Sequence, residues 1–248
     1  MSNFWKKFRI RLKIFFRIPV SDDDLLYLFK QMNFKLLNKI NLSPQNEVLM
    51  VNFNSFDLFK WFVRYVPLRE PAQMAILDKE NFFEYFVGLR ELDDAAECEL
   101  IRRNNADFIR YYIDLYGLSD EAEKIMLDVC SRDVIVPYIR MHGFGPVSLL
   151  KLIRSNSEFL IKTYIDWHPI KWRTAQVALI ESGNEEVIKS YICRNNLSDD
   201  AEVELINSQN EELIKLYLKG HKLSRSAKIA LLETENVRLF ELYVENHS

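Results

Sequence analysis

Apolar residues recur along most of the chain with a period of 26 residues. With a small residue taken as position 0, apolar side chains stand at positions 4 and 5 and again at 12, 13, 16 and 17. Spacing of i, i+1, i+4 and i+5 lays one stripe along a helix, so each period predicts two amphipathic helices. The frame is marked by the small residue and a tyrosine sixteen residues later: Ala96 and Tyr112, Ala122 and Tyr138, Ser148 and Tyr164, Ala175 and Tyr191, Ala201 and Tyr217, Ala227 and Tyr243.

Residues that cap helices stand at two fixed places in each period. Side chains of Asn, Asp and Ser accept hydrogen bonds from the unsatisfied N–H groups at a helix start. They predict two helix starts per period, which together describe a helical hairpin. At position 9 they are Ser55, Asn81, Asn105, Ser131, Ser157, Asn184, Asn210 and Asn236, and three residues before position 0 they are Ser43, Asp93, Ser119, Ser198 and Ser224.

A hairpin of this length cannot bury its own apolar face and must stack on its neighbours. The sequence therefore predicts an all-α fold, an α-solenoid of about eight 26-residue hairpins over residues 42–248. A degenerate capping hairpin is expected over residues 20–41, after a basic amphipathic segment over residues 1–19. The unit that follows Ala72 is two residues short, and its second helix is expected from Asn81 to Val87.

The string LSDDAEVELINSQNEELIKLYLKGHK (197–222) resembles the short two-helix repeats of bacterial solenoid proteins, those called leucine-rich repeat variants, and more distantly HEAT-like arrays. The period is shorter than the roughly 40 residues of HEAT repeats. The resemblance implies a right-handed superhelix and a binding role, and it implies no active site.

Composition and motifs limit the classes of function. Three cysteines at different repeat positions indicate reduced thiols in a reducing compartment. There is no run of apolar residues long enough for a membrane span and no secretory signal, so a cytoplasmic location, in a bacterium or a host cell, is expected. The sequence has no glycine-rich phosphate loop, HExxH, CxxC or nucleophile elbow. We therefore expect a protein that is not an enzyme and has no cofactor or metal.

The N-terminal segment is the most basic part of the chain. The formal net charge is −3, and residues 1–20 carry +6 with no acid, which leaves −9 on the rest. On a helical wheel, aromatic and aliphatic residues from Phe4 to Phe16 lie opposite the cations. Such a helix could cap the open end of the solenoid, bind an anionic membrane surface or partner, or act in targeting. The contact residues for a membrane or an anionic partner are Trp5, Lys6, Lys7, Phe8, Arg9, Lys13 and Arg17.

Three ladders of polar residues invite functional interpretations. Histidines at position 20 (His142, His168, His221, His247) could bind metal, but equivalent residues of stacked hairpins lie too far apart to share an ion, and the end of a helix suits a cationic side chain. The tyrosines fall inside the apolar stripe, which favours a core role with the hydroxyl reaching a loop or water over an aromatic binding strip. Cations at position 14 (Lys60, Arg110, Lys162, Lys189, Lys215) could follow a phosphate backbone, but Glu158, Glu185 and Glu211 precede the last three by four residues, which favours intrahelical ion pairs.

Function is therefore expected where the repeat is irregular or exposed. Pro137 should kink its helix, and residues 118–170 are the least regular region, through drift or because a ligand binds there. The apolar C-terminal end, with Phe240 and Val244, could dock another protein or a second copy of the chain. The expected function is a protein–protein interaction scaffold or adaptor; a peripheral membrane adaptor anchored by the N-terminal helix is the alternative, and nucleic-acid binding ranks below both. Candidate partner contacts are Lys162, Asp166, Trp167, His168, Trp172, Lys189, Lys215 and Lys219.

Overall fold

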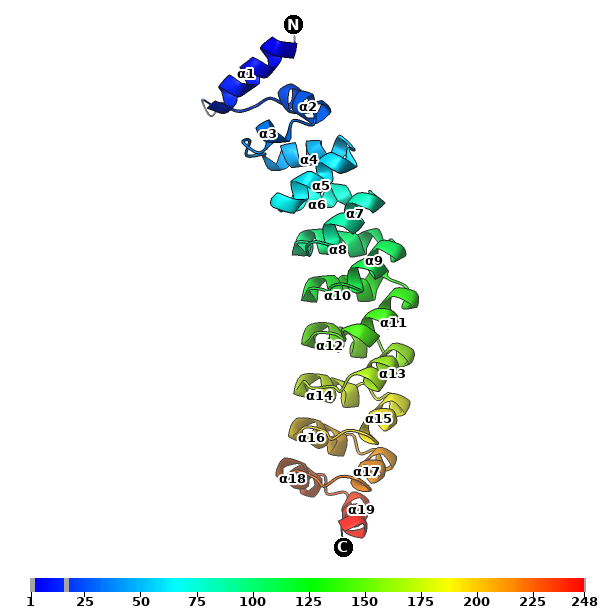
Figure 1. Ribbon diagram of the computed structural model, residues 1–248. Coiled ribbons are helices and arrows are strands. Elements are labelled where there is room, and N and C mark those ends of the chain that lie inside the picture. The colour runs from blue at the N-terminus through cyan, green and yellow to red at the C-terminus, as the bar shows by residue number, and fades with distance from the viewer. Residues whose placement is uncertain (1–2, 16–17, 248) are drawn as a thin grey trace. The chain divides into compact units, whose positions relative to one another are not determined.

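The computed structural model describes residues 3–15 and 18–247, with the backbone alone at residues 3–5 and at residue 247. These residues form nineteen α-helices and no strand (Figure 1). Contacts between Cα atoms divide the chain into two compact units, residues 1–116 and residues 117–248. The helices of the first unit are α1 (Asn3–Phe15), α2 (Asp22–Lys30), α3 (Phe34–Leu37), α4 (Pro44–Asn52), α5 (Phe56–Tyr65), α6 (Glu70–Ile76), α7 (Glu80–Val87), α8 (Asp94–Arg103) and α9 (Ala106–Ile113).

The second unit continues the same alternation of first and second helices. Its first helices are α10 (Asp120–Val129), α12 (Pro146–Arg154), α14 (Arg173–Glu181), α16 (Asp199–Asn207) and α18 (Arg225–Glu233). Its second helices are α11 (Arg132–Met141), α13 (Glu158–Trp167), α15 (Glu185–Ile192), α17 (Glu211–Leu218) and α19 (Val237–His247). Within each unit, a first helix packs on the first helix of the next hairpin, and a second helix on the next second helix. From α4 to α19 the described residues thus form eight hairpins, which confirms the predicted helical-repeat solenoid.

The small residue at position 0 lets neighbouring first helices approach closely. Ala96, Ala122, Ala175, Ala201 and Ala227 are fully buried. A larger side chain there would push the helix rows apart, because a close-packed interior does not absorb extra volume without strain. The period of small residues in the sequence is therefore a period of helix contacts in the fold.

Most of the predicted caps occupy helix starts. The side chains of Ser55, Asn105, Asn184 and Asn210 each accept a hydrogen bond from a backbone N–H of the first turn that follows. The prediction that Asn81 caps the start of its helix was wrong. The shortened unit starts α7 at Glu80 with Lys79 in the N-cap position, so Asn81 lies inside the helix.

In most hairpins, the turn between the two helices has a left-handed residue at position 8. Asn54, Asn104, Asn156, Gln209 and Glu235 have φ between 51° and 59°. Asparagine tolerates this conformation through local hydrogen bonding, whereas Gln and Glu pay the full steric cost of their Cβ atom. Pro137 lies inside α11, and the helix continues through it from Arg132 to Met141.

Candidate functional site

The tyrosine ladder is part of the core and is bound to buried acids. Tyr112, Tyr138 and Tyr217 are at most 1% exposed. Their hydroxyls donate to Glu97, Glu123 and Glu202 over 3.2, 2.8 and 2.8 Å. The core interpretation of these tyrosines is confirmed. The hydroxyls of Tyr138 and Tyr217 also reach a loop, as predicted, because they accept from the backbone N–H groups of Leu118 and Leu197 over 3.1 and 3.2 Å; the carboxylate partner was not predicted.

Each of these acids belongs to a series of Glu or Gln at position 1, and Glu123 and Glu202 also bind the next hairpin. The second oxygen of Glu123 accepts from the backbone N–H of Gly145 over 2.9 Å, and that of Glu202 accepts from Ser224 over 2.7 Å. We call this series the polar clasp; its members are Glu47, Gln73, Glu97, Glu123, Gln176 and Glu202. The clasp was not predicted from the sequence, although Glu or Gln directly follows position 0 in six hairpins.

Burial shifts the pKa of Glu123, one of the acids of the clasp. Desolvation raises the pKa of Glu123, and hydrogen bonds from the Gly145 N–H and the Tyr138 hydroxyl offset part of that effect. Desolvation likewise raises the pKa of Tyr164 to about 12 and that of Tyr112 further. These hydroxyls therefore stay protonated, which suits a structural role.

The histidines stack on the tyrosines of their own hairpins. Ring centroids of Tyr138 and His142 lie 5.1 Å apart, and those of Tyr217 and His221 lie 4.4 Å apart. The Nε2 atom of His168 contacts the carbonyl oxygen of Ile139 in the preceding hairpin. Within the described residues there is no group of three or more His, Cys, Asp or Glu side chains placed to hold a metal ion. His168 therefore packs within the array; the side chain of His247 lies outside the described residues.

The basic ladder at position 14 is largely neutralised by acids. Lys162 binds Glu158 over 2.7 Å, and Lys189 binds Glu185 over 3.4 Å, as predicted. Glu211 instead lies 4.0 Å from Arg238 of the following hairpin. The remaining predicted contacts are placed as follows: Asp166 pairs with Arg194 over 3.1 Å, Lys215 and Lys219 are exposed, and Trp172 is half-buried at the start of α14.

A row of exposed apolar residues marks the C-terminal ends of the second helices. Tyr65, Leu89 and Leu115 of the first unit are 71%, 49% and 49% exposed, and Met141 and Trp167 of the second unit are 45% and 57% exposed. These five residues occupy position 19 of five consecutive hairpins, or the equivalent position in the shortened hairpin. We call them the position-19 row. Only Trp167 was singled out from the sequence. The period of 26 residues could have revealed the other four.

In the second unit, arginines lie over the exposed aromatic rings. The guanidinium carbon of Arg140 is 5.6 Å from the ring centre of Trp167, and that of Arg132 is 5.0 Å from Phe159. Phe159 is 50% exposed and occupies position 11 of its hairpin, where the other full-length hairpins carry Asp, Glu or Arg. The groove beside it has a volume of about 610 Å³ and is also lined by Arg132, Asn156, Ser157, Glu158, Lys162, Thr163 and Asp166.

The cations of α1 divide between two roles. Arg9 and Lys13 bind the fully buried carboxylate of Asp24 in α2 over 2.5 and 2.7 Å. Burial alone would raise the pKa of Asp24, but the hydrogen bonds from Lys13 and Arg9 outweigh it, and the pKa is lowered. Two of the cations predicted to meet an anionic surface are therefore committed to holding α1 against α2.

The apolar face of α1 stays exposed. Phe8, Leu12 and Phe15 are 44%, 41% and 78% exposed, while Ile10 is buried. Lys6 lies over the ring of Tyr27, 5.0 Å from its centre. The side chain of Trp5 and the whole of Arg17 lie outside the described residues.

The last hairpin exposes a face that is buried in the others. Leu232, Phe240 and Val244 are 64%, 45% and 43% exposed, whereas Ile214 and Leu218, which are equivalent to the last two, are 1% and 3% exposed. Within the described part of the chain, no helix combines the length and the apolar character needed to cross a membrane.

Three comparisons with known proteins returned no match. The chain matches no family model, no curated protein and no solved structure. The candidate sites therefore depend on geometry and chemistry alone.

Proposed function

We propose that the chain is a non-enzymatic scaffold that binds a protein partner through the position-19 row. The observation that carries this proposal is the exposure of a large apolar residue at the same place in five consecutive hairpins. Tyr, Trp and Met are enriched at protein interfaces, and single exposed apolar residues scattered over a surface would not repeat with the period of the fold.

Within each compact unit, the row suits a partner segment that crosses successive second helices. Second helices α5, α7 and α9 pack in succession in the first unit, and so do α11 and α13 in the second. Packed helices lie about 8–10 Å apart, so equivalent side chains form a line of anchors at that spacing. In the second unit the guanidinium of Arg140 lies over the ring of Trp167, and guanidinium–aromatic pairs of this kind can carry a large share of binding energy.

The finer aspects of the proposal rest on sequence. The likeness to leucine-rich-repeat-variant and HEAT-like arrays supports a binding role, and the reduced-thiol pattern supports a cytoplasm, bacterial or host. Pairing of the position-14 cations with acids counts against the nucleic-acid alternative, because those charges are already neutralised.

Peripheral membrane association is a second candidate function. It is favoured by α1, where Phe8, Leu12 and Phe15 are exposed beside basic residues. An exposed aromatic stripe flanked by cations is typical of helices that lie in the interface of an anionic bilayer.

Affinity capture with a matched pair of variants tests the scaffold proposal. One variant carries Met141→Ser and Trp167→Ser; the control carries Val147→Ser and Ile229→Ser, two residues that are each 48% exposed on first helices. Proteins retained by the wild type and the control but lost from the row variant would support the proposal. An identical set retained by both variants, or no specific set, would overturn it; circular dichroism verifies that each bait is folded.

A further inference from the structure

The part of α1 that faces α3 lines a basic groove. Its cations are Lys7 and Arg11 from α1 with Lys35 from α3 and Lys39 just beyond it. The groove has a volume of about 610 Å³, and its other lining residues are Ile14, Phe15, Asn33 and Leu36. Four cations therefore converge on one space whose lining includes no carboxylate.

The ion pairs of α1 explain why Lys7 and Arg11 face the groove. Arg9 and Lys13 hold the helix against the buried Asp24, which fixes the rotation of α1 about its axis. Lys7 and Arg11, four residues apart on α1, share another face, and like charges at this spacing on a helix repel one another. Lys35 and Lys39 add two more cations to the same groove. A bound anion would relieve that repulsion, so the groove is complementary to negative charge.

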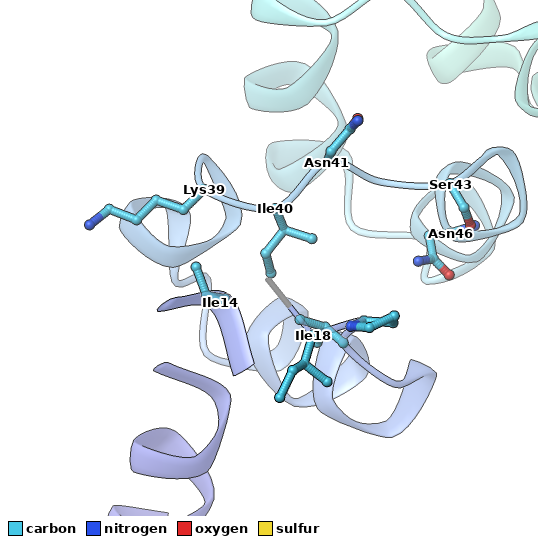
Figure 2. A pocket seen from close by; sticks show the side chains of 9 residues that line it. Ile14, Ile18, Lys39, Ile40, Asn41, Ser43 and Asn46 are labelled. Atoms are coloured by element: carbon cyan, nitrogen blue, oxygen red, sulfur yellow. The ribbon is translucent and has the colours of Figure 1, made fainter. Parts of the chain in front are cut away.

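A largely apolar groove, called the apolar groove below, adjoins the basic one. It has a volume of about 510 Å³ and shares Ile14 and Lys39 with its neighbour; its other lining residues are the apolar Ile18, Pro19, Val20 and Ile40 and the polar Asn41, Ser43 and Asn46. In Figure 2 the side chain of Ile40 points toward Ile18, with Ile14 close by, while Lys39 directs its amine away from them. The stem of Lys39 thus borders the apolar space and its charge lies outside it, an arrangement usual for lysines at an amphipathic boundary.

We propose that the two grooves bind an anionic lipid of a membrane surface, with the headgroup phosphate among Lys7, Arg11, Lys35 and Lys39 and acyl carbons along Ile14, Ile18 and Ile40. A free phosphate has no apolar part that could occupy the apolar groove. A nucleic acid would place its polar backbone against aliphatic side chains there. The exposed Phe15 beside the cations gives the same surface an anchor in the interface. This inference deepens the membrane-association candidate and rests on it.

Vesicle co-sedimentation of the full chain tests the proposal. The vesicles contain phosphatidylcholine and phosphatidylglycerol in a two-to-one ratio, with phosphatidylcholine alone as the neutral reference. The groove variant carries Lys35→Gln and Lys39→Gln; the control carries Lys171→Gln and Lys222→Gln, which removes the same charge at exposed positions of the second unit. Each basic residue at an anionic surface contributes about five-fold in binding, so the groove variant should bind about thirty-fold more weakly and the control as the wild type does.

The possible outcomes separate the groove from membrane association. Selective loss in the groove variant, with salt-sensitive wild-type binding to the anionic vesicles alone, supports the proposal. Equal binding by both variants leaves membrane association standing and overturns the groove. If the wild type binds neither kind of vesicle, both ideas fail. Binding of inorganic phosphate or a single-stranded oligonucleotide by titration calorimetry, without vesicle binding, overturns the lipid as occupant.

Discussion

Replacing Glu123 by alanine should destabilise the array far more than replacing it by glutamine. Glu123 is 4% exposed, and its two oxygens accept from the Tyr138 hydroxyl and the Gly145 N–H. Alanine leaves the buried Tyr138 hydroxyl and the half-buried Gly145 N–H without that acceptor. An unsatisfied buried group costs about 1–3 kcal/mol and a donor that water can reach costs less, so the expected loss is roughly 2–4 kcal/mol.

Replacement by glutamine should lower the free energy of unfolding by about 1 kcal/mol or less, because another hairpin already has glutamine at the same position. Gln176 occupies the same position, accepts from the Ser198 N–H over 2.7 Å and donates to the Tyr191 hydroxyl over 3.0 Å. The Tyr191 hydroxyl then donates to the carbonyl of Ile170. In the Glu123→Gln variant the hydroxyl of Tyr138 must redirect its proton in the same way.

The variants also differ in pH dependence. Burial raises the folded-state pKa of Glu123 above its ordinary 4.5, so the folded state holds the proton more tightly than the unfolded state. The favourable contribution of this group is then complete below pH 4.5 and is lost as pH rises through the folded-state pKa. Glutamine does not titrate, so the stability of Glu123→Gln relative to the wild type should increase over that window.

Urea unfolding followed by far-ultraviolet circular dichroism measures these differences at several pH values. Alanine and glutamine variants of equal stability would refute the clasp, because they would show that the buried oxygens carry no net energy. So would a stability difference between Glu123→Gln and the wild type that stays constant across the acidic range.

Three further predictions follow from the fold. Gln209→Gly should raise the free energy of unfolding by about 1 kcal/mol, because glycine relieves a φ of 51°; thermal unfolding with no gain would contradict it. Asp24→Asn removes two ion pairs, so amides of α1 should exchange at least about ten-fold faster. Because the pKa of Asp24 is lowered, protection of the α1 amides in the wild type should be present at neutral pH and fall as pH drops through the folded-state pKa of Asp24. If neither the substitution nor the pH changed the exchange rate of α1, the account of how Asp24 holds α1 against α2 would be wrong. Leu232 and Phe240 are exposed at positions that are otherwise buried, so copies should associate at high concentration and Leu232→Ser with Phe240→Ser should abolish this; light scattering from a strict monomer would contradict it.

The fold was predictable because its determinants repeat. Ala201 and Tyr217 each have equivalents at the same spacing, and the packing of one hairpin on the next demands the same residue type each time. Caps such as Asn184 and Asn210 marked helix starts for the same reason. The error at Asn81 arose where the period changed, since a two-residue deletion shifted the helix start relative to the frame.

The candidate sites were less predictable because they depend on what the next helix covers. An acid such as Glu123 in the first turn of a helix is already explained by the helix dipole, and only the following hairpin buries it. A helical wheel placed Arg9 and Lys13 on a cationic face but could not tell that Asp24 would bind them. The exposure of Leu115 at the end of α9 likewise depends on what the neighbouring helices leave uncovered.

Site-specific photo-crosslinking tests the proposed binding surface most directly. A photoreactive phenylalanine analogue replaces Trp167 in the position-19 row or, as the matched control, Val147 on the first helix α12. In the native host's lysate, illumination should yield a discrete protein adduct from position 167 and none from position 147. No adduct at either position, or the same adducts at both, would contradict a partner bound along the row.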